Sequence, residues 1–202
     1  MGNLHSVQRS FERLGQPLIA VRSPEDLNAC DALVLPGVGA FDPAMEKLKS
    51  SGLIGPLRRW HHDGRPLLGI CLGLQLLFER SDEGCSEGLG LFEGRVQRLP
   101  EQPGERIPHM GWGQLKRQRP CPLLPSAEEQ PWVYFVHSYA AVPDQASDRA
   151  ATVTFGQDQA TAMVWKNRTG ACQFHPEKSA KAGVQLLNNW ITWLQCGAQQ
   201  PQ

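Results

Sequence analysis

The sequence lacks the features that would place a protein in a membrane, in the secretory pathway or on nucleic acid. Its 202 residues contain 20 Lys and Arg against 20 Asp and Glu, so no net charge is available to attract a nucleic acid or an anionic membrane. No apolar run approaches the roughly 18 residues that a membrane span requires, and residues 1–10 lack the apolar centre of a signal peptide. We therefore expect a cytoplasmic protein that acts on a small molecule or on another protein.

Closely spaced cysteine pairs are also absent. The six cysteines are scattered along the chain: Cys30, Cys71, Cys85, Cys121, Cys172 and Cys196. Their spacings match neither a zinc site nor a redox-active dithiol, so each cysteine needs its own interpretation.

Hydrophobic periodicity divides the chain into a first half of alternating strands and helices and a second half rich in strands. Apolar residues at helical spacing run from residue 4 to 14 and end at Gly15. Strands are expected at residues 18–21, 32–35 and 66–70, and helices near Pro24, near Asp42 and at residues 72–78. Further strand candidates are residues 91–99, 133–136, 151–155, 162–165 and 171–174, before a helix over 180–194.

This pattern predicts a three-layer α/β domain with a mixed sheet. At this length one domain buries roughly 70% of the surface that its unfolded chain exposes. We assign it to residues 1–196 and expect residues 197–202 to form a disordered tail.

Cys71 is the candidate nucleophile. It lies between a buried strand and a helix in the segment GICLG, residues 69–73, with glycine two residues away on each side. This is the sulfur analogue of a nucleophile elbow, in which a tight turn exposes the nucleophile and the helix start favours a thiolate. The N–H group of Leu72 would then face an oxyanion. A lone cysteine is more often a buried apolar residue, so this interpretation needs support from the rest of the chain.

His175 is the candidate base. In the segment HPE, residues 175–177, the side chains of His175 and Glu177 lie two residues apart and point the same way on an extended chain. A carboxylate that accepts one ring N–H leaves the other nitrogen facing the thiol, which completes a triad of nucleophile, base and orienting group. His109 and His137 remain alternatives for the base.

A glycine-rich turn follows the strand at residues 32–35. The segment PGVGAF, residues 36–41, can turn several backbone N–H groups toward a ligand. It lacks the Lys and Ser/Thr of a phosphate-binding loop and the full dinucleotide fingerprint, so nucleotide binding has little support.

Taken together, the segments GVG at 37–39, GICLG at 69–73 and HPE at 175–177 resemble the class I glutamine amidotransferases in their order and spacing. The resemblance implies a glutaminase that needs neither a metal nor an organic cofactor. Its catalytic triad would be Cys71, His175 and Glu177. Its oxyanion hole would be formed by Leu72, Gly37, Val38 and Gly39.

Within this class the chain resembles the glutaminase subunits of imidazole glycerol phosphate synthase. The resemblance lies in four segments: GNLHSV at 2–7, HMGW at 109–112, YFVHSY at 134–139 and HPEKS at 175–179. It implies a heterodimer in which L-glutamine is hydrolysed here and ammonia passes to a cyclase subunit, a (β/α)8 barrel, in histidine biosynthesis. The alternatives are a class I subunit serving pyridoxal phosphate, anthranilate or purine synthesis, against which the HMGW segment argues, and a non-catalytic binding module, against which the triad argues.

The resemblance also assigns residues outside the triad. It implies glutamine binding by Gln75, Glu83, Ser138 and Tyr139, and a cyclase interface that includes Trp112 and Lys178. Gly113 departs from the family, which commonly carries Asn after this Trp.

The family's central sheet is mixed and mostly parallel, and its first strand precedes the GNLHSV segment. That strand would lie upstream of Met1, so we expect Met1 to be an internal residue of a longer natural chain.

Overall fold

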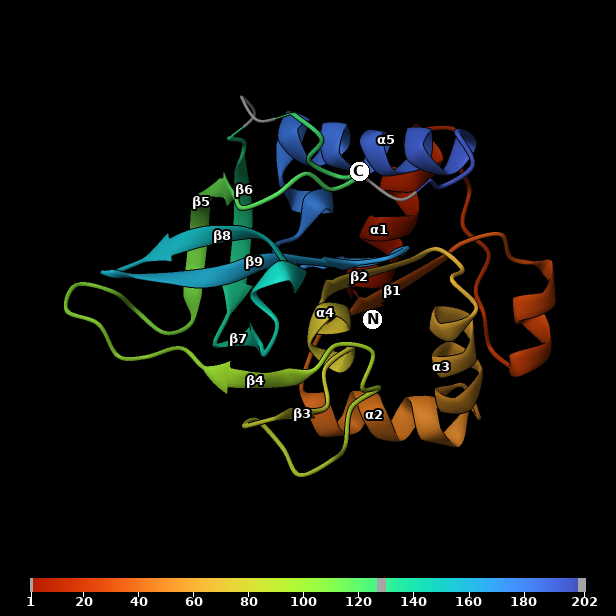
Figure 1. Ribbon diagram of the computed structural model, residues 1–202, viewed down its shortest axis with the longest axis horizontal. Coiled ribbons are helices and arrows are strands. Elements are labelled where there is room, and N and C mark those ends of the chain that lie inside the picture. Colours follow the sequence, from red (N-terminus) through yellow and green to blue (C-terminus); the bar gives the residue numbers. More distant parts are fainter. Residues whose placement is uncertain (1, 127–129, 200–202) are drawn as a thin grey trace.

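The computed structural model describes residues 2–126 and 130–199, which form an α/β fold with two sheets (Figure 1). The α-helices are α1 (Gly2–Arg13), α2 (Phe41–Ser50), α3 (Ile54–His62), α4 (Leu72–Leu76) and α5 (Ala180–Gln195), and the 3-10 helices are η1 (Pro24–Ala29), η2 (Ala146–Asp148) and η3 (Pro176–Lys178). The strands are β1 (Leu33–Gly37), β2 (Leu67–Cys71), β3 (Arg80–Ser81), β4 (Gly94–Arg98), β5 (His109–Arg117), β6 (Trp132–His137), β7 (Tyr139–Pro143), β8 (Arg149–Phe155), β9 (Asp158–Lys166) and β10 (Thr169–Cys172).

The main sheet is mixed, as expected. It has seven strands in the order β1-β2-β10-β9-β8-β5-β6, and a small second sheet has the order β3-β4-β7. In the main sheet β2 pairs in parallel with both β1 and β10, and the other four pairings are antiparallel. The antiparallel pairings outnumber the parallel ones because β9, β8, β5 and β6 extend the sheet beyond β10.

Helices cover both faces of the parallel part of the sheet. In Figure 1, α1 and α5 lie on one side of β1 and β2, and α2 and α3 lie on the other. The α1–α5 layer is closed by Phe11 and Trp190, whose rings meet edge to face at 5.8 Å between centroids. Leu68 and Ile70 of β2 pack in the same core as these helices, whereas Leu67 packs with α2 and α3. This alternation is what a strand buried on both faces requires.

Most of the elements expected from the sequence are present. The strand and helix around Cys71, the opening and closing helices, and every strand candidate from residue 91 onward correspond to observed elements. Strands β5 and β7 were not expected, because the HMGWGQLKR and YAAVP segments carry no simple alternation of apolar and polar residues.

The expected strand at residues 18–21 is wrong. These residues are irregular, and Ile19 is 65% exposed. β1 is the edge strand of the described sheet, and residues 18–21 do not pair with its open edge. The apolar residues Leu18 and Val21 instead pack against the edges of the two cores.

The described part of the chain ends in a turn after α5. The turn after α5 is held by the Trp193 indole N–H, which donates to the carbonyl of Gln199, and Ala198 is buried. The rest of the expected tail, residues 200–202, lies outside the described residues.

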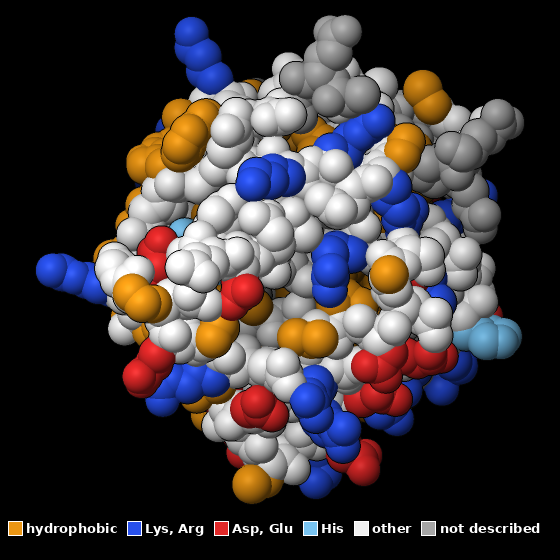
Figure 2. Space-filling view, turned by 60° about the vertical axis from the view of Figure 1, so that its left-hand side comes forward, with side chains coloured by type: hydrophobic (Ala, Val, Ile, Leu, Met, Phe, Trp, Pro, Cys, Tyr) orange, Lys and Arg blue, Asp and Glu red, His pale blue; other side chains and the backbone are white. Residues whose placement is uncertain are grey.

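The surface mixes both signs of charge, in keeping with equal numbers of acidic and basic residues. Figure 2 shows basic and acidic side chains interspersed over the face that it displays. In the described ranges, no helix combines the length and the apolarity needed to cross a bilayer.

Candidate active site

Cys71 lies at a strained junction between a buried strand and a helix. It ends β2 and precedes α4, with φ 56° and ψ −111°, a backbone conformation that residues other than glycine rarely adopt. The turn is tight because a Cβ atom on Gly73 would come within 1.8 Å of the Leu35 carbonyl oxygen. A Cβ atom on Gly69 would lie 2.9 Å from that of Ala171. Glycine is therefore required on both sides, as the elbow interpretation predicted.

Because β2 lies between β1 and β10, three segments meet at the carboxyl ends of these strands. β1 runs parallel to β2 with Gly37 opposite Cys71, so the glycine-rich loop starts beside the thiol. On the other side β10 is parallel to β2 with Cys172 opposite Ile70, and His175 follows three residues later. Parallel strands place their carboxyl ends at the same edge, which explains how residues about 100 positions apart converge.

His175 and Glu177 form a buried pair. The Nδ1 atom of His175 lies 2.7 Å from Oε1 of Glu177, and the two side chains are 2% and 0% exposed. Burial by itself disfavours the imidazolium, but hydrogen bonds and opposite charge from Cys71 and Glu177 outweigh it and raise the pKa of His175 to about 9. The geometry therefore places the Cys71 sulfur next to a protonated imidazole, which a carboxylate orients.

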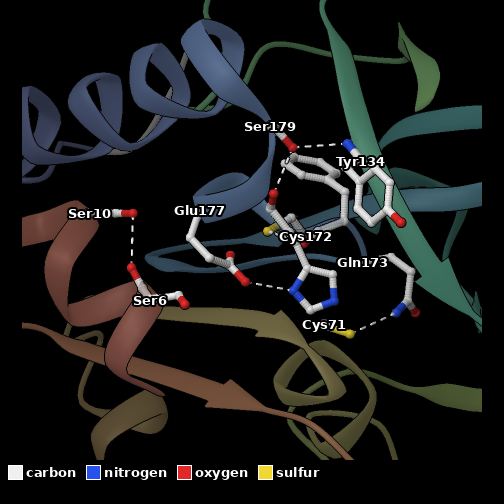
Figure 3. A network of polar contacts seen from close by, with 10 residues as sticks. Ser6, Ser10, Cys71, Tyr134, Cys172, Gln173, Glu177 and Ser179 are labelled. Carbon is white, nitrogen blue, oxygen red and sulfur yellow. Dashed lines mark hydrogen bonds and ion pairs between the residues drawn. The ribbon is translucent and has the colours of Figure 1, made fainter. Parts of the chain in front are cut away.

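The backbone around His175 is fixed by strand β6 (Figure 3). The His175 N–H donates to the Tyr134 carbonyl at 2.9 Å, and the Ser179 hydroxyl donates to the His175 carbonyl at 2.6 Å. The same hydroxyl oxygen accepts the Tyr134 N–H at 2.9 Å. These bonds tie the HPEKS segment to the sheet, so the imidazole position is set by β6 as well as by β10.

The family model described as "Glutamine amidotransferase class-I" matches residues 1–193. The chain belongs to the class-I glutamine amidotransferases. Imidazole glycerol phosphate synthase subunit HisH 2 of Prochlorococcus marinus (strain MIT 9313) is 63% identical to it, over 98% of this chain and 93% of the relative. The subunit HisH of Synechococcus sp. (strain CC9902) is 61% identical over the same shares.

Solved structures of low identity share this fold. A "Crystal structure of glutamine amidotransferase" superposes with a TM-score of 0.73 at 19% identity, covering 95% of this chain and 93% of that one. The "Structure of PurLQS from Thermotoga maritima" gives 0.69 at 16% identity, covering 94% and 92%. The expected fold class is thereby confirmed.

In this amidotransferase the glycine-rich loop beside Cys71 is anchored at its far end by Glu83. The Oε2 atom of Glu83 accepts the N–H of Phe41, the first residue of α2, at 2.9 Å. In return, Asp42 accepts the N–H groups of Cys85 and Ser86 at 3.0 and 2.9 Å. Between these anchors and β1 the loop is free to turn: Gly39 has φ 101°, and Val38 is 48% exposed.

Of the other residues expected to bind glutamine, Gln75 and the Tyr139 backbone are linked to Cys71 through Gln173. Gln75 lies one helical turn after Cys71 and is 5% exposed. Its Nε2 donates to the Tyr139 carbonyl at 3.1 Å, which brings the start of β7 to α4. Ser138 separates β6 from β7, and its carbonyl accepts the Leu99 N–H at 2.9 Å. Gln75, Tyr139 and Cys71 are thus assembled, while Glu83 reaches the site through α2.

His109 and His137, the alternatives for the base, form a pair of their own. The Nδ1 atom of His109 lies 3.2 Å from Nε2 of His137, and Nδ1 of His137 lies 2.8 Å from the Tyr139 carbonyl. Burial, helped by the charges of His109 and His175, lowers the pKa of His137 to about 4 despite the hydrogen bond to Tyr139. His137 is therefore neutral at neutral pH and occupied by structural bonds, which favours His175 as the base.

The residues expected at a partner interface lie next to the active site on the outside of the sheet. Trp112 pairs with Tyr134 across β5 and β6, is 49% exposed, and contacts that ring edge to face. Lys178 is exposed at the end of η3, one residue before the Ser179 that binds Tyr134.

Gly113 has a structural reason to be glycine in this chain. A Cβ atom there would lie 2.6 Å from Cγ2 of Val153 and 3.0 Å from the Phe135 ring. A side chain at this position would therefore point into the core, and the family's Asn could not be placed without moving these neighbours.

Gln173 was not singled out from the sequence. It is fully buried, and its Nε2 lies 3.9 Å from the sulfur of Cys71. The sequence feature that could have identified it is a polar residue at the end of an apolar strand, two positions before His175. This spacing puts both side chains on one side of an extended chain.

Proposed function

We propose that this chain is the glutaminase subunit of an imidazole glycerol phosphate synthase, which hydrolyses L-glutamine and passes the ammonia to a cyclase subunit. The buried His175–Glu177 pair beside Cys71 carries the proposal for the chemistry. The names of relatives that are 63% and 61% identical over almost the whole chain support the choice of synthase.

The first half of the reaction forms a covalent intermediate. The Cys71 thiolate, whose proton His175 holds, attacks the carboxamide carbon of glutamine, and the carbonyl oxygen becomes an oxyanion. The N–H groups of Leu72 and of the loop that carries Gly37, Val38 and Gly39 stabilise this charge. When the C–N bond breaks, protonated His175 gives its proton to the nitrogen, so neutral ammonia leaves and a glutamyl thioester remains on Cys71.

The second half regenerates the Cys71 thiolate and protonated His175. His175, now neutral, takes a proton from water as the water oxygen attacks the thioester carbonyl. Collapse of the tetrahedral intermediate breaks the C–S bond and releases glutamate. Glu177 keeps the imidazole in one tautomer throughout, because its carboxylate accepts the Nδ1–H group.

The ammonia must reach the partner without entering bulk water, where protonation would remove its lone pair. The exposed apolar residues Met110 and Trp112 lie on β5, next to the β6 strand that holds the HPEKS segment. We place the cyclase interface on this surface, with Trp112 and Lys178 in it. A heterodimer joined here would enclose the path from Cys71 to the second active site.

Control by the partner would act on the glycine-rich loop. The loop is flanked by the fixed end of β1 and by the Glu83 anchor at Phe41, and its middle residue Val38 is exposed. Rotation of the Val38 peptide could therefore turn its N–H group into or out of the oxyanion hole without moving either end. We infer that the isolated subunit hydrolyses glutamine slowly and that the ligand-loaded cyclase accelerates it.

A glutamine-analogue electrophile tests the chemical part of this proposal. Incubation with a diazoketone analogue should add one equivalent of label to the peptide that contains Cys71, and excess glutamine should slow the reaction. Cys71→Ser should remove the label. Labelling that stays on the exposed Cys85 and Cys196, or that glutamine does not slow, would contradict the proposal.

A further inference from the structure

A chain of buried amide groups ends at the Cys71 sulfur. Gln173 is fully buried and Gln75 is 5% exposed. The Nε2 atom of Gln75 donates to the Tyr139 carbonyl and to Oε1 of Gln173, each at 3.1 Å. The Nε2 atom of Gln173 lies 3.9 Å from the Cys71 sulfur, within the range of a hydrogen bond to sulfur (Figure 3).

The direction of every bond in this chain is determined by the Tyr139 carbonyl, which can only accept. It receives the Nδ1–H of His137 at 2.8 Å and one N–H of Gln75. The second N–H of Gln75 points to Gln173, so Gln173 must turn its oxygen toward Gln75. Its NH2 group is then left facing Cys71. The orientation of the Gln173 amide is therefore imposed by groups on β6, β7 and α4.

An N–H donor at this position acts differently on the two forms of the nucleophile. A thiolate accepts a hydrogen bond more strongly than a thiol does, because the bond is charge-assisted. The donor also limits the directions in which the sulfur can lie, which matters at a nucleophile that must meet a carbonyl carbon along one line. At the same time Gln173 holds Gln75, a residue of the proposed glutamine pocket.

We propose that Gln173 is a positioning residue of the active site, which orients the Cys71 sulfur for attack and fixes Gln75 in the substrate pocket. The inference rests on the proposed function, in which Cys71 is the nucleophile. The inference goes beyond the proposed function, because neither His175 nor Glu177 can orient the sulfur from the side where Gln173 and β7 lie.

Two variants separate the sulfur contact from the contact with Gln75. Gln173→Met keeps the length of the side chain and removes both contacts. Gln173→Glu, in its ionised form, keeps an acceptor for Gln75 but has no donor for the sulfur. Gln157→Met makes the same change as the first variant in an exposed turn between β8 and β9 and serves as the matched control.

The first readout is the rate at which iodoacetamide alkylates Cys71 in the full chain, because this reagent needs no glutamine pocket. Peptide mapping by mass spectrometry follows Cys71, and the exposed Cys85 and Cys196 serve as internal references. The second readout is kcat and KM for glutamine. Thermal melting shows whether a variant is merely destabilised.

Iodoacetamide should alkylate Cys71 about tenfold more slowly in both Gln173 variants than in the wild type. This is the loss expected for one hydrogen bond to a charged group. The value of kcat should fall by a similar factor, and KM should rise only in Gln173→Met, where Gln75 is released. Gln157→Met should match the wild type.

Alkylation within twofold of the wild type in both variants would overturn the proposal. A Gln173→Glu variant that behaves like the wild type while Gln173→Met is slow would also overturn it, because Gln173 would then only support Gln75. If Gln173→Met does not fold, the alkylation rate of Gln173→Glu decides. If the wild type hydrolyses no glutamine, the proposed function fails, whereas the alkylation comparison still tests Gln173.

Discussion

At the residue scale, the proposed reaction depends on Glu177, whose carboxylate helps His175 to keep its proton. Glu177→Gln keeps an acceptor for the Nδ1–H group but removes the negative charge that helps to raise the pKa of His175 to about 9. The imidazolium that protonates the leaving ammonia is lost as the pH rises through this pKa. The alkaline limb of kcat/KM for glutamine should therefore lie near pH 9 in the wild type, and about one pH unit or more lower in the variant.

The same charge affects stability in a defined direction. Because the pKa of His175 is raised above its ordinary value of 6.5, its stabilising effect is complete below about pH 6.5 and is lost as the pH rises through about 9. Urea unfolding at a series of pH values should show this loss in the wild type and less of it in Glu177→Gln. An alkaline limb that does not move in the variant would show that Glu177 does not control His175.

His137 makes the opposite prediction, on the acid side. Its pKa is lowered to about 4 by burial, so below pH 6.5 the unfolded chain takes up a proton that the folded protein refuses. Between pH 7 and pH 5 this should cost about 2 kcal/mol of unfolding free energy, at roughly 1.4 kcal/mol for each pKa unit. His137→Asn, which keeps a donor for the Tyr139 carbonyl, should lose that much less stability over the same range in urea titrations. Equal losses in the two proteins would contradict a buried neutral His137.

The proposed catalytic residues were easier to find in the sequence than the residues packed around them. Cys71, His175 and Glu177 stand in short motifs whose spacing reflects the backbone geometry. Gln173 and the His109–His137 pair act through contacts between strands that are distant in the sequence. Such contacts depend on the order of strands in the sheet, which the sequence alone did not give.

At the element scale, the hydrogen bonds between the start of α2 and residues 83–86 should determine how firmly the glycine-rich loop is held. Hydrogen bonds from the backbone N–H groups of Cys85 and Ser86 lower the pKa of Asp42 and so favour its carboxylate form. Asp42→Ala should leave those two N–H groups without their partner, and their hydrogen exchange should speed up several-fold. The value of KM for glutamine should rise because the loop that carries Glu83 loosens.

A matched control for this change is Asp63→Ala, since Asp63 is an exposed acidic residue at the end of α3. It should leave the exchange of residues 83–86 unchanged. Exchange that is equally slow in Asp42→Ala and the wild type would show that the anchor does not hold the loop.

Element boundaries followed the sequence where burial was uniform and departed from it where pairing decided the structure. β2 is buried along its whole length and was expected within one residue of its observed bounds. Residues 18–21 have the apolar composition of a strand, but they form no ladder with the edge strand β1. β5 alternates inward and outward side chains, but its outward positions include the apolar Met110 and Trp112, so the strand does not show as an alternation of apolar and polar residues in the sequence.

At the scale of the whole molecule, the surface around Trp112 should bind the cyclase. Trp112→Ala removes a half-exposed ring from the strand next to the active site, and a Trp at the centre of an interface typically contributes about 2 kcal/mol or more. The dissociation constant for the cyclase should rise by at least about tenfold, while hydrolysis of glutamine by the isolated subunit stays the same. Calorimetry with the purified cyclase measures the first and a glutamate assay measures the second.

Val184→Ala is the control for this surface, because Val184 is 52% exposed on α5 and belongs to neither β5 nor β6. It should bind the cyclase as the wild type does. If Trp112→Ala binds equally well, the interface lies elsewhere on the molecule.

In the proposed function, Cys71 supplies ammonia to a reaction that another chain carries out. The most direct test compares wild-type and Cys71→Ala subunits in complex with the cyclase, with synthesis of imidazole glycerol phosphate measured once with glutamine and once with ammonium salt as the nitrogen source. We predict that Cys71→Ala abolishes synthesis from glutamine and leaves synthesis from ammonium unchanged. Loss of both activities, or survival of the glutamine-dependent one, would contradict the claim.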